Sequence, residues 1–460
     1  MILRLFGRAA ALLAACAVTA SASAQTVKPA APICADCVRV HMEKLAGDAL
    51  RGRACGTEDE HAASLYLQAE LAKAGIAPAL GGGMRQAVGL ETPRLAAPPT
   101  LEAKWSGGGA HLTQGEDFVV LSDPSPVAGR LVRVASADAA GDIKGAIVFY
   151  DHAGRDRAGI QRLQRAGASA VLFPADAALT AHWAQLAASA QPRSRVADAE
   201  NEPARPSMVV LSEKAAEALR SAPDGASAEL GVRFGAPERS TTYNVVGVIH
   251  GTDPDADRKA LLLSAHYDHL GVRNGVIYHG ADDDASGTSA VLEFARILGS
   301  SPRPRRTVYF ALFGCEESGG LGAIYFRAHP PGALSDLAMN IEFEMIGNDD
   351  PKRPGVLMLT GWERSNLGPT LAAHGAHVGP DLYPEQNFFQ RSDNYELALK
   401  GVVAQTVSAW PIPPTYHDPS DTLDRIDFAF MDQAIGSMVG PVQWLVDSDF
   451  KPEWKPGMKP

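Results

Sequence analysis

Histidines and carboxylates gather where apolar stretches of this sequence end. His266 and Asp268 follow the apolar run at 261–263 and stand two residues apart, so in an extended strand their side chains point to the same side. An imidazole that binds a metal ion normally has a carboxylate or carbonyl on its other nitrogen, and Asp268 is placed to serve. A histidine at a strand end beside a solvated aspartate would explain the pair equally well. The metal-binding interpretation therefore needs support from the rest of the chain.

Three consecutive aspartates, Asp282, Asp283 and Asp284, precede Ala-Ser-Gly and a stretch of helical pattern. Aspartate favours helix starts, and capping would account for one or two of the three. Three adjacent carboxylates repel one another, however, and a divalent cation would relieve that repulsion. The residues themselves do not say which of the three would bind it.

Further side chains of this kind follow three other apolar stretches. Glu316 and Glu317 come after "TVYFALFG"; neighbouring side chains point in different directions, so one can bind metal while the other faces substrate. Glu344 lies in "MNIEFEMIG", where a buried carboxylate needs a partner. The loop "PTYHDPSDT" adds Tyr416 and His417 after the strand-like "GVVAQTVSA".

Taken together, these five sites supply two histidines and three carboxylates, with a further glutamate to spare. Such a set suits two zinc ions that share a bridging carboxylate, and the extra glutamate could transfer protons. The sequence contains neither the H-E-x-x-H helix of other metalloproteases nor the G-x-S-x-G turn of a serine nucleophile. A metal-activated water is therefore the expected nucleophile.

The order of these motifs resembles the di-zinc aminopeptidases of peptidase family M28. The motifs are His-x-Asp, Gly-Ala-Asp-Asp-Asp-Ala-Ser-Gly, Glu-Glu, Glu-Met-Ile-Gly and Tyr-His-x-Pro-x-Asp-Thr. The segment "LAGDALRGRACGTEDEHAASLYL" resembles the N-terminal part of that family, and the middle of the chain resembles a protease-associated domain. The similarity covers essentially the whole chain after its leader.

This resemblance implies a ligand for each metal position. His266 and Glu344 would hold one zinc ion. Glu317 and His417 would hold the other, and Asp283 would bridge the two.

The resemblance also implies roles for four further side chains. Glu316 would be the general base and acid, and Asp268 would orient His266. Tyr416 would help to stabilise the tetrahedral oxyanion. Arg391, in "RSDN", matches a position near the substrate amino terminus in some members of the family.

The chain departs from the family pattern at several positions. Glu344 stands where aspartate is usual; it is one methylene longer but still offers a hard oxygen ligand. Asn394 stands where histidine is common. Cys315 is interpreted as a small packed residue, and His269 and His279 are not ligands in the family pattern, so supporting or surface roles are expected for them.

The elements that must position these residues are strands and helices in alternation. After residue 242, apolar strands such as "ALLLSAHYD" and "TVYFALFG" alternate with helices such as "TSAVLEFARIL". In that helix Val291, Phe294, Ala295 and Leu298 mark one buried face. The pattern predicts an α/β fold with a mostly parallel central sheet flanked by helices, as in zinc aminopeptidases, and ligands of such sheets bind at the carboxyl ends of the strands.

The expected organisation has five parts, with a helical pattern running from about residue 40 to 77. They are a signal peptide at 1–24, an N-terminal part of the peptidase domain at 25–112, an inserted small protease-associated α/β domain at 113–235, a catalytic zinc peptidase domain at 236–450, and a flexible tail at 451–460.

The leader predicts export to a bacterial periplasm or beyond. Arg4 and Arg8 precede an apolar stretch at 9–18, and an A-x-A cleavage site ends at Ala24. A lipoprotein cleavage box at Cys16 is the less favoured alternative. The net charge of -11 argues against nucleic acid or anionic lipid as the main partner, and no other segment is long enough to span a membrane.

Four cysteines remain after the leader: Cys34, Cys37, Cys55 and Cys315. An oxidising compartment makes a disulfide among the first three plausible, and a bridge that ties the N-terminal segment to Cys55 is the favoured pairing.

The sequence therefore predicts an exported di-zinc metallopeptidase that removes the N-terminal residue from peptides with a free N-terminus. One alternative is a carboxypeptidase of the glutamate carboxypeptidase type, which needs basic residues for a terminal carboxylate. Another is a non-catalytic binding protein on the same fold, which a loss of ligands would signal. Side-chain preference, oligomeric state and the role of the inserted domain stay open.

Overall fold

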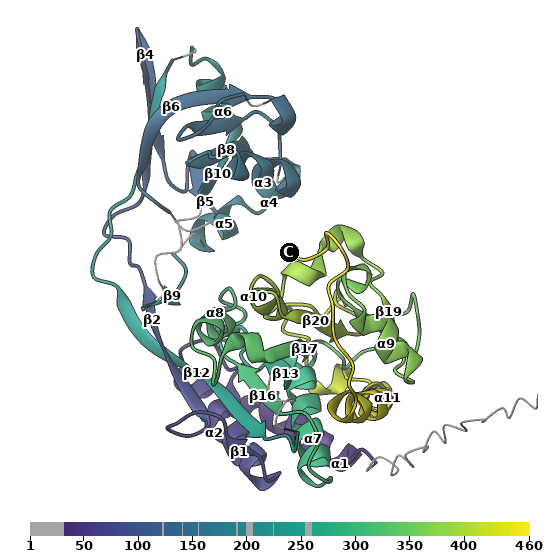
Figure 1. Ribbon diagram of the computed structural model, residues 1–460. Coiled ribbons are helices and arrows are strands. Elements are labelled where there is room, and N and C mark those ends of the chain that lie inside the picture. Colours follow the sequence, from purple (N-terminus) through teal and green to yellow (C-terminus); the bar gives the residue numbers. More distant parts are fainter. Residues whose placement is uncertain are drawn as a thin grey trace, which may run out of the picture.

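Two β-sheets organise the chain, and they lie in separate parts of the computed structural model (Figure 1). The structure describes residues 32–460 except 122–123, 140, 155, 190–191, 199–205, 224 and 254–259. The expected signal peptide at 1–24, with Cys16, lies outside the described residues. Within them, no helix combines the length and the apolar character needed to cross a membrane.

The larger sheet contains ten strands among the described residues. In spatial order they are β19 (Val378–Pro380), β18 (Leu357–Leu359), β20 (Val403–Ser408), β17 (Leu337–Phe343), β13 (Ala260–His266), β16 (Val308–Phe313), β12 (Glu238–Ile249), β2 (Arg85–Thr92) and β9 (Arg195–Val196), with β1 (Ala77–Pro78) also paired to β12. A separate hairpin of β14 (Gly271–Arg273) and β15 (Val276–Tyr278) follows β13.

The four central strands of this sheet, β20, β17, β13 and β16, are parallel. The flanking pairs β12–β16, β12–β2 and β18–β20 are antiparallel. The expected α/β fold is confirmed, with parallel pairing concentrated at the centre of the sheet. Because parallel strands all end at the same edge, the residues that follow β13, β16, β17 and β20 come together there.

Helices cover both faces of the larger sheet. The helices that pack on the sheet are α1 (Ala35–Leu45), α2 (Glu58–Lys73), α7 (Gly287–Gly299), α8 (Leu321–Ala328), α9 (Leu367–Ala373), α10 (Asn394–Ala398) and α11 (Phe428–Asp447). Alternate residues of β13 face opposite sides: Leu261 and Leu263 pack in the apolar cluster that includes α1, α2, α7, α9 and α11, whereas Leu262 packs with α8 and α10.

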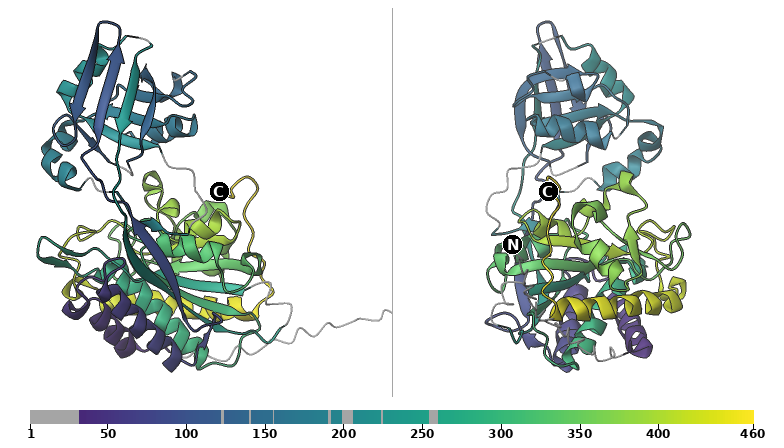
Figure 2. Two further views of the ribbon diagram at one scale, coloured as in Figure 1. Left: turned by 90° about the vertical axis from the view of Figure 1, so that its left-hand side faces the viewer. Right: turned by 45° about the vertical axis from the view of Figure 1, so that its right-hand side comes forward.

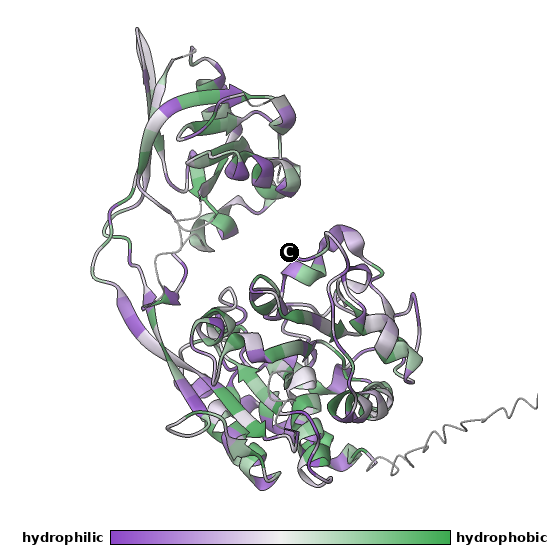
Figure 3. Ribbon diagram, in the orientation of Figure 1, coloured by the Kyte–Doolittle hydropathy of each residue, from purple (hydrophilic) through white to green (hydrophobic). Residues whose placement is uncertain are grey.

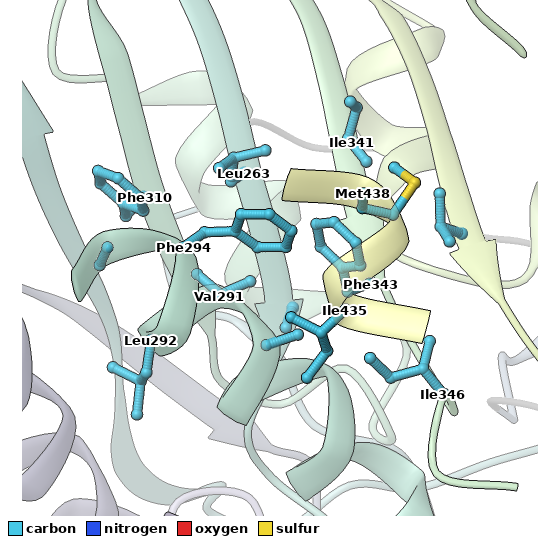
Figure 4. Close-up of a cluster of buried hydrophobic side chains, with 14 of the residues drawn as sticks. Leu263, Val291, Leu292, Phe294, Phe310, Ile341, Phe343, Ile346, Ile435 and Met438 are labelled. Carbon is cyan, nitrogen blue, oxygen red and sulfur yellow. The ribbon is translucent and has the colours of Figure 1, made fainter. Parts of the chain in front are cut away.

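Helix α7 presents the apolar face that the sequence predicted. Its residues Val291, Phe294, Ala295 and Leu298 are all buried. Figure 4 shows Val291 and Phe294 beside Leu263, Phe343 and side chains of α11. The four predicted residues are buried as expected, but the helix is enclosed on its other sides too, because only Arg296 and Gly299 are not buried. This enclosure fixes the helix that follows the three aspartates.

The single helical stretch expected at 40–77 is wrong, because the structure contains two helices, α1 and α2, separated by a loop at 46–57. Arg51, Gly52 and Arg53 all have positive φ in this loop, a conformation that no α-helix can contain. Thr57 then starts α2 by accepting a hydrogen bond from the Glu60 N–H.

The smaller sheet contains eight strands among the described residues. They are, in order, β4 (Gly108–Thr113), β3 (Thr100–Trp105), β11 (Ser227–Gly231), β6 (Val127–Val134), β7 (Ile147–Tyr150), β8 (Ala170–Pro174), β10 (Ser207–Leu211) and β5 (Phe118–Val120), accompanied by α3 (Arg157–Arg165), α4 (Ala177–Ala181), α5 (Trp183–Ser189) and α6 (Glu213–Arg220). Two apolar clusters of its own fill its faces.

The long antiparallel pair β2–β12 connects the two parts (Figure 2). The first half of β12 is mostly exposed and polar, and its second half is buried in the larger sheet, a change that Figure 3 shows as purple giving way to green. Strand β9 returns from the inserted segment to pair with β2.

The expected start of the inserted domain at residue 113 is wrong. Strands β3 and β4 pair with each other, and β3 pairs with β11, so the smaller sheet begins at Thr100. The Gly/Pro-rich composition around residues 97–109 gives no strand pattern, but this stretch contains the tight turn at 106–107 that joins β3 to β4. At the other end, β11 stops at Gly231 and β12 begins at Glu238, on either side of the expected boundary.

The expected flexible tail at 451–460 is also wrong, because it is bound to the larger domain. The Lys455 N–H donates to the Arg364 carbonyl at 2.7 Å, and the Trp454 indole donates to the Gly401 carbonyl at 3.2 Å. The Trp454 ring packs edge-on against Phe389. The half-buried Trp454 ring and these hydrogen bonds together fix the segment on the larger domain.

The cysteines pair differently from the expectation. Cys34 bonds to Cys37, and Cys55 bonds to Cys315, 260 residues away. The favoured bridge from the N-terminal segment to Cys55 is therefore wrong, although the Cys34–Cys37 bond is a disulfide among the first three cysteines, as expected. Cys315 is packed in a buried apolar cluster, as interpreted, and is disulfide-bonded as well. The long-range bridge joins the loop at 46–57 to the residue that precedes Glu316.

This long-range disulfide should contribute more stability than the short one. The Cys55→Ser/Cys315→Ser variant should lose about 2–4 kcal/mol of unfolding free energy, because the Cys55–Cys315 bond closes a much longer loop than the Cys34–Cys37 bond and so restricts the unfolded chain more. The matched Cys34→Ser/Cys37→Ser variant should lose clearly less. Urea unfolding of both variants and the parent measures the difference, and equal losses would contradict the expectation.

Candidate metal centre

The predicted site residues lie at one edge of the larger sheet, each just at or after the end of a different element. His266 is the last residue of β13, and Glu344 directly follows β17. Glu317 follows β16, and His417 lies in the loop after β20. Asp283 lies in the irregular turn η4 (Ala281–Ser286) that leads into α7.

The two carboxylate oxygens of Asp283 face different histidines. Oδ1 lies 3.3 Å from His266 Nε2, and Oδ2 lies 3.2 Å from His417 Nε2. Two donors on a tetrahedral zinc ion are about 3.3 Å apart, given zinc–ligand distances of about 2.0–2.1 Å. The spacing and the opposed directions are those of a carboxylate that bridges two ions.

The remaining donor atoms form one group on each side of Asp283. Those of His266, Asp283 and Glu344 lie within 4.8 Å of one another, as do those of His269, Asp283 and Glu317. His417 Nε2 joins the second group at 3.1 Å from Glu317 Oε2.

Several of these donor atoms are buried without a hydrogen-bond partner among the described residues: His266 Nε2, both ring nitrogens of His269 and Glu317 Oε1. Buried polar atoms are almost always satisfied, so the concentration of these unpartnered donor atoms at one point indicates a cation-binding site. The residues present therefore fit a pair of metal ions.

The flanking aspartates have structural partners instead. Asp282 accepts hydrogen bonds from the Gly347 N–H at 2.8 Å and from the Asn348 amide at 2.9 Å. Asp284 accepts from the N–H groups of Gly287 and Met345, at 2.9 and 3.1 Å. Both carboxylates thus tie the turn to neighbouring backbone, while the Asp283 carboxylate faces the histidines.

Asp268 connects two of the ligand-bearing segments. Its carboxylate accepts hydrogen bonds from the N–H groups of Glu316 and Glu317, at 2.8 and 3.3 Å. Its Oδ1 also lies 3.7 Å from His266 Nδ1, and its carbonyl oxygen lies 3.3 Å from the same nitrogen. This side chain is thus placed both to orient His266 and to hold the Glu316 loop.

The adjacent Glu316 and Glu317 have opposite electrostatic environments. Burial raises the pKa of the Glu316 carboxyl well above its usual range, and the charges of Asp393, Glu317 and Glu344 raise it further. Burial and Asp283 also act to raise the pKa of Glu317, but the imidazoles of His269 and His417 outweigh them and lower it. One glutamate is therefore suited to hold a proton and the other to stay charged.

Sequence reasoning gave no role to Arg53, which is fully buried beneath the site. Its guanidinium donates to the carbonyls of Tyr267, His279 and Gly280, at 2.6, 2.7 and 3.0 Å, and also to that of Leu45. Burial lowers its pKa to about 10, so it remains protonated at neutral pH. A positive charge thus lies under the carboxylates and joins both ends of the segment between His266 and Asp283.

His269 was also missed, because the family pattern gives it no role. The structure places it fully buried, with Nδ1 2.9 Å from Glu317 Oε1. Its position one residue after Asp268 was the available signal. His279, by contrast, pairs with Asp48 at 2.8 Å, away from the metal groups.

An open pocket gives access to the site. It is lined by Asp283, Glu316, Glu317, Glu344, Met345, Met358, Thr360, Phe388, Arg391, Ser392, Thr406, Ser408, Pro411, Tyr416 and His417. The Tyr416 ring stacks on His417 with centroids 4.0 Å apart, and Arg391 donates to the Tyr416 oxygen at 3.2 Å. Asn394 lies behind the pocket, where its N–H donates to Glu342 at 2.7 Å.

Comparison with known proteins gives a family match for the larger domain. Residues 244–439 match the model of peptidase family M28. The probable lipoprotein aminopeptidase LpqL of Mycobacterium tuberculosis is 26% identical over 224 residues, which cover 40% of this chain and 42% of that protein. The alignments span less than half the length of the curated relatives.

Two solved structures share the fold over most of their length. An aminopeptidase from Aneurinibacillus sp. strain AM-1 has a TM-score of 0.57 at 19% identity, covering 90% of this chain and 94% of that one. BSAP, a zinc aminopeptidase from Bacillus subtilis, has a TM-score of 0.51 at 19% identity, covering 91% and 96%. The expected aminopeptidase-like fold is thereby confirmed.

Replacing Arg53 should destabilise the protein far more than replacing its neighbour Arg51. Arg53→Met leaves carbonyls and carboxylates without their buried cation, so we expect a loss of about 3–5 kcal/mol in unfolding free energy. Arg51 shares the positive φ but its side chain is 59% exposed, so Arg51→Met should cost less than about 0.5 kcal/mol. Urea unfolding measures both, and similar losses would show that the guanidinium contacts matter little.

Proposed function

Because residues 244–439 belong to peptidase family M28, we propose that this protein is an exported zinc aminopeptidase that removes the N-terminal residue from peptides. The observation that carries the proposal is the Asp283 carboxylate, whose two oxygens face His266 and His417. The names of the similar proteins, an aminopeptidase and a zinc aminopeptidase, agree with it.

Two zinc ions would share Asp283 as the common ligand. His266 and Glu344 would complete one position, and Glu317 and His417 the other. Zinc held by these residues would lower the pKa of water and polarise the scissile carbonyl. Glu344 is longer than the usual aspartate, but its donor atom lies within the group of His266 and Asp283.

Glu316 would move the proton during the reaction. Its carboxylate lines the pocket beside Glu344 and takes a proton from the attacking water. The surroundings that raise its pKa help it to hold that proton, which it then delivers to the nitrogen of the leaving amine. Asp268 supports this step by fixing the backbone N–H of Glu316.

The Tyr416 hydroxyl would donate a hydrogen bond to the developing oxyanion. Stacking on His417 and the hydrogen bond from Arg391 hold the phenol at the pocket rim. A guanidinium would repel the substrate ammonium, so orienting Tyr416 suits Arg391 better than contacting the substrate amino terminus. The ring of Phe388, 4.7 Å from the guanidinium carbon, fixes it in this position.

The charge of the pocket favours an aminopeptidase over a carboxypeptidase. Four acidic side chains line it, whereas Arg391 is the only lysine or arginine among the described lining residues. Metal ions would neutralise part of this charge, and the remainder suits a substrate α-ammonium. The complete set of ligands also speaks against the non-catalytic alternative.

Export remains part of the proposal. Two disulfides in the described part of the chain suit an oxidising compartment, as does the leader sequence at 1–24. The less favoured anchoring through Cys16 would keep the same active domain at a membrane surface.

Reporter peptides should distinguish the proposed activity from its rivals. Zinc-loaded protein should cleave aminoacyl reporters with a free amine, and chelation should abolish that activity until zinc is restored. Glu316→Gln should lower kcat by about 10²–10⁴-fold while keeping both zinc ions. Cleavage of N-blocked peptides from the carboxyl end would support the carboxypeptidase instead, and zinc binding without any turnover would support a binding protein.

Substitutions at the three aspartates should distinguish the proposed metal ligand, Asp283, from the two residues that only stabilise the turn, Asp282 and Asp284. Asp283→Ala should abolish the binding of a zinc pair, whereas Asp282→Ala and Asp284→Ala should retain more zinc and lose stability instead. Zinc per chain, measured by elemental analysis on folded protein, provides the comparison. The reverse order would place the bridging carboxylate elsewhere in the turn.

A further inference from the structure

Building on the proposed function, we propose that His269 is a fourth protein ligand of the metal ion held by Asp283, Glu317 and His417. The two metal positions would then differ: one closed by four protein ligands, and one, at His266, Asp283 and Glu344, left open. Closed coordination is typical of structural zinc sites, and an open position is typical of catalytic ones.

The position of the His269 ring supports ligation. Nδ1 lies 2.9 Å from Glu317 Oε1 and 3.9 Å from Asp283 Oδ2, so it belongs to one group of donor atoms with these two carboxylates. Neither ring nitrogen has a hydrogen-bond partner among the described residues, although the side chain is fully buried. The ring thus approaches Glu317 without being aligned to donate to it. The proposed ligating nitrogen of His266, Nε2, shows the same combination at 3.3 Å from Asp283, while His266 Nδ1 lies 3.3 Å from the Asp268 carbonyl oxygen.

The surrounding chain holds this ring in place from several sides. The His269 N–H donates to the Arg53 carbonyl at 3.3 Å, and the ring meets His417 edge-on with centroids 5.9 Å apart. Gly280, at φ 60°, leaves the space that the ring occupies: a Cβ there would lie 2.4 Å from His269 Cγ and 2.2 Å from the Asp283 carbonyl oxygen. The ring is thus fixed and enclosed with Nδ1 directed toward Glu317 and Asp283, so binding a cation there requires no movement of the ring.

The unequal coordination assigns different roles to the two positions. The position next to His417 would bind metal more tightly and would mainly hold Asp283 and Glu317 in place. The position next to His266 would keep room for substrate. This difference rests on the number of protein ligands alone, because the pocket wall contains Glu316 together with ligands of both positions, Glu344 on one side and Glu317 and His417 on the other. Zinc should therefore bind in two steps, and the first equivalent should occupy the closed position.

Zinc titration of the full chain tests this assignment. After removal of metal, wild-type protein is titrated calorimetrically, and X-ray absorption of the sample with one equivalent counts the imidazoles bound to zinc. We expect two imidazoles, from His269 and His417, and a first affinity that falls by more than about 100-fold in His269→Ala, beyond the effect usual for a residue that only orients a ligand. His279→Ala is the matched control and should titrate like the wild type.

The possible outcomes separate this inference from the function on which it rests. One imidazole in the wild-type sample, or equal titrations of His269→Ala and His279→Ala, would overturn the ligand role while leaving the zinc pair intact. No zinc binding by the wild type would overturn both proposals. The imidazole count uses wild-type protein alone, so it decides the matter even where His269→Ala fails to fold.

Discussion

Buried negative charge at the carboxyl edge of the larger sheet constrains everything built around it. Four carboxylates, those of Asp268, Asp282, Asp283 and Asp284, are buried side by side at this edge. Removing even one unpaired carboxylate from water costs several kcal/mol, and their mutual repulsion adds to that cost. Backbone N–H groups offset part of this cost at Asp268, Asp282 and Asp284, and the histidines, the Arg53 guanidinium and the proposed metal ions supply the balancing positive charge.

The N-terminal segment takes part in this charge balance rather than merely covering the sheet. The loop between α1 and α2 brings Arg53 under the acids and Cys55 to Cys315, beside the Glu316 loop. Its positive-φ residues turn the chain so that both side chains point inward. The same loop receives the His269 N–H, so one short segment fixes the strand end, the aspartate turn and the glutamate loop together.

The smaller domain stands outside this network. It has two apolar clusters of its own and joins the larger sheet through β2, β12 and β9. The site residues all come from the larger domain, so the metal centre can form without side chains from the insertion.

The sequence by itself determined the fold class and the positions of the acidic and histidine side chains at strand ends. It could do so because continuous apolar strands with intervening helices must form a parallel core, which brings their carboxyl ends to one edge. Only the tertiary structure decided the partners of Cys55, Arg53 and His269, the start of the smaller sheet at Thr100 and the docking of Trp454. Each of these depends on contacts between segments far apart in the chain, and local pattern carries no information about them.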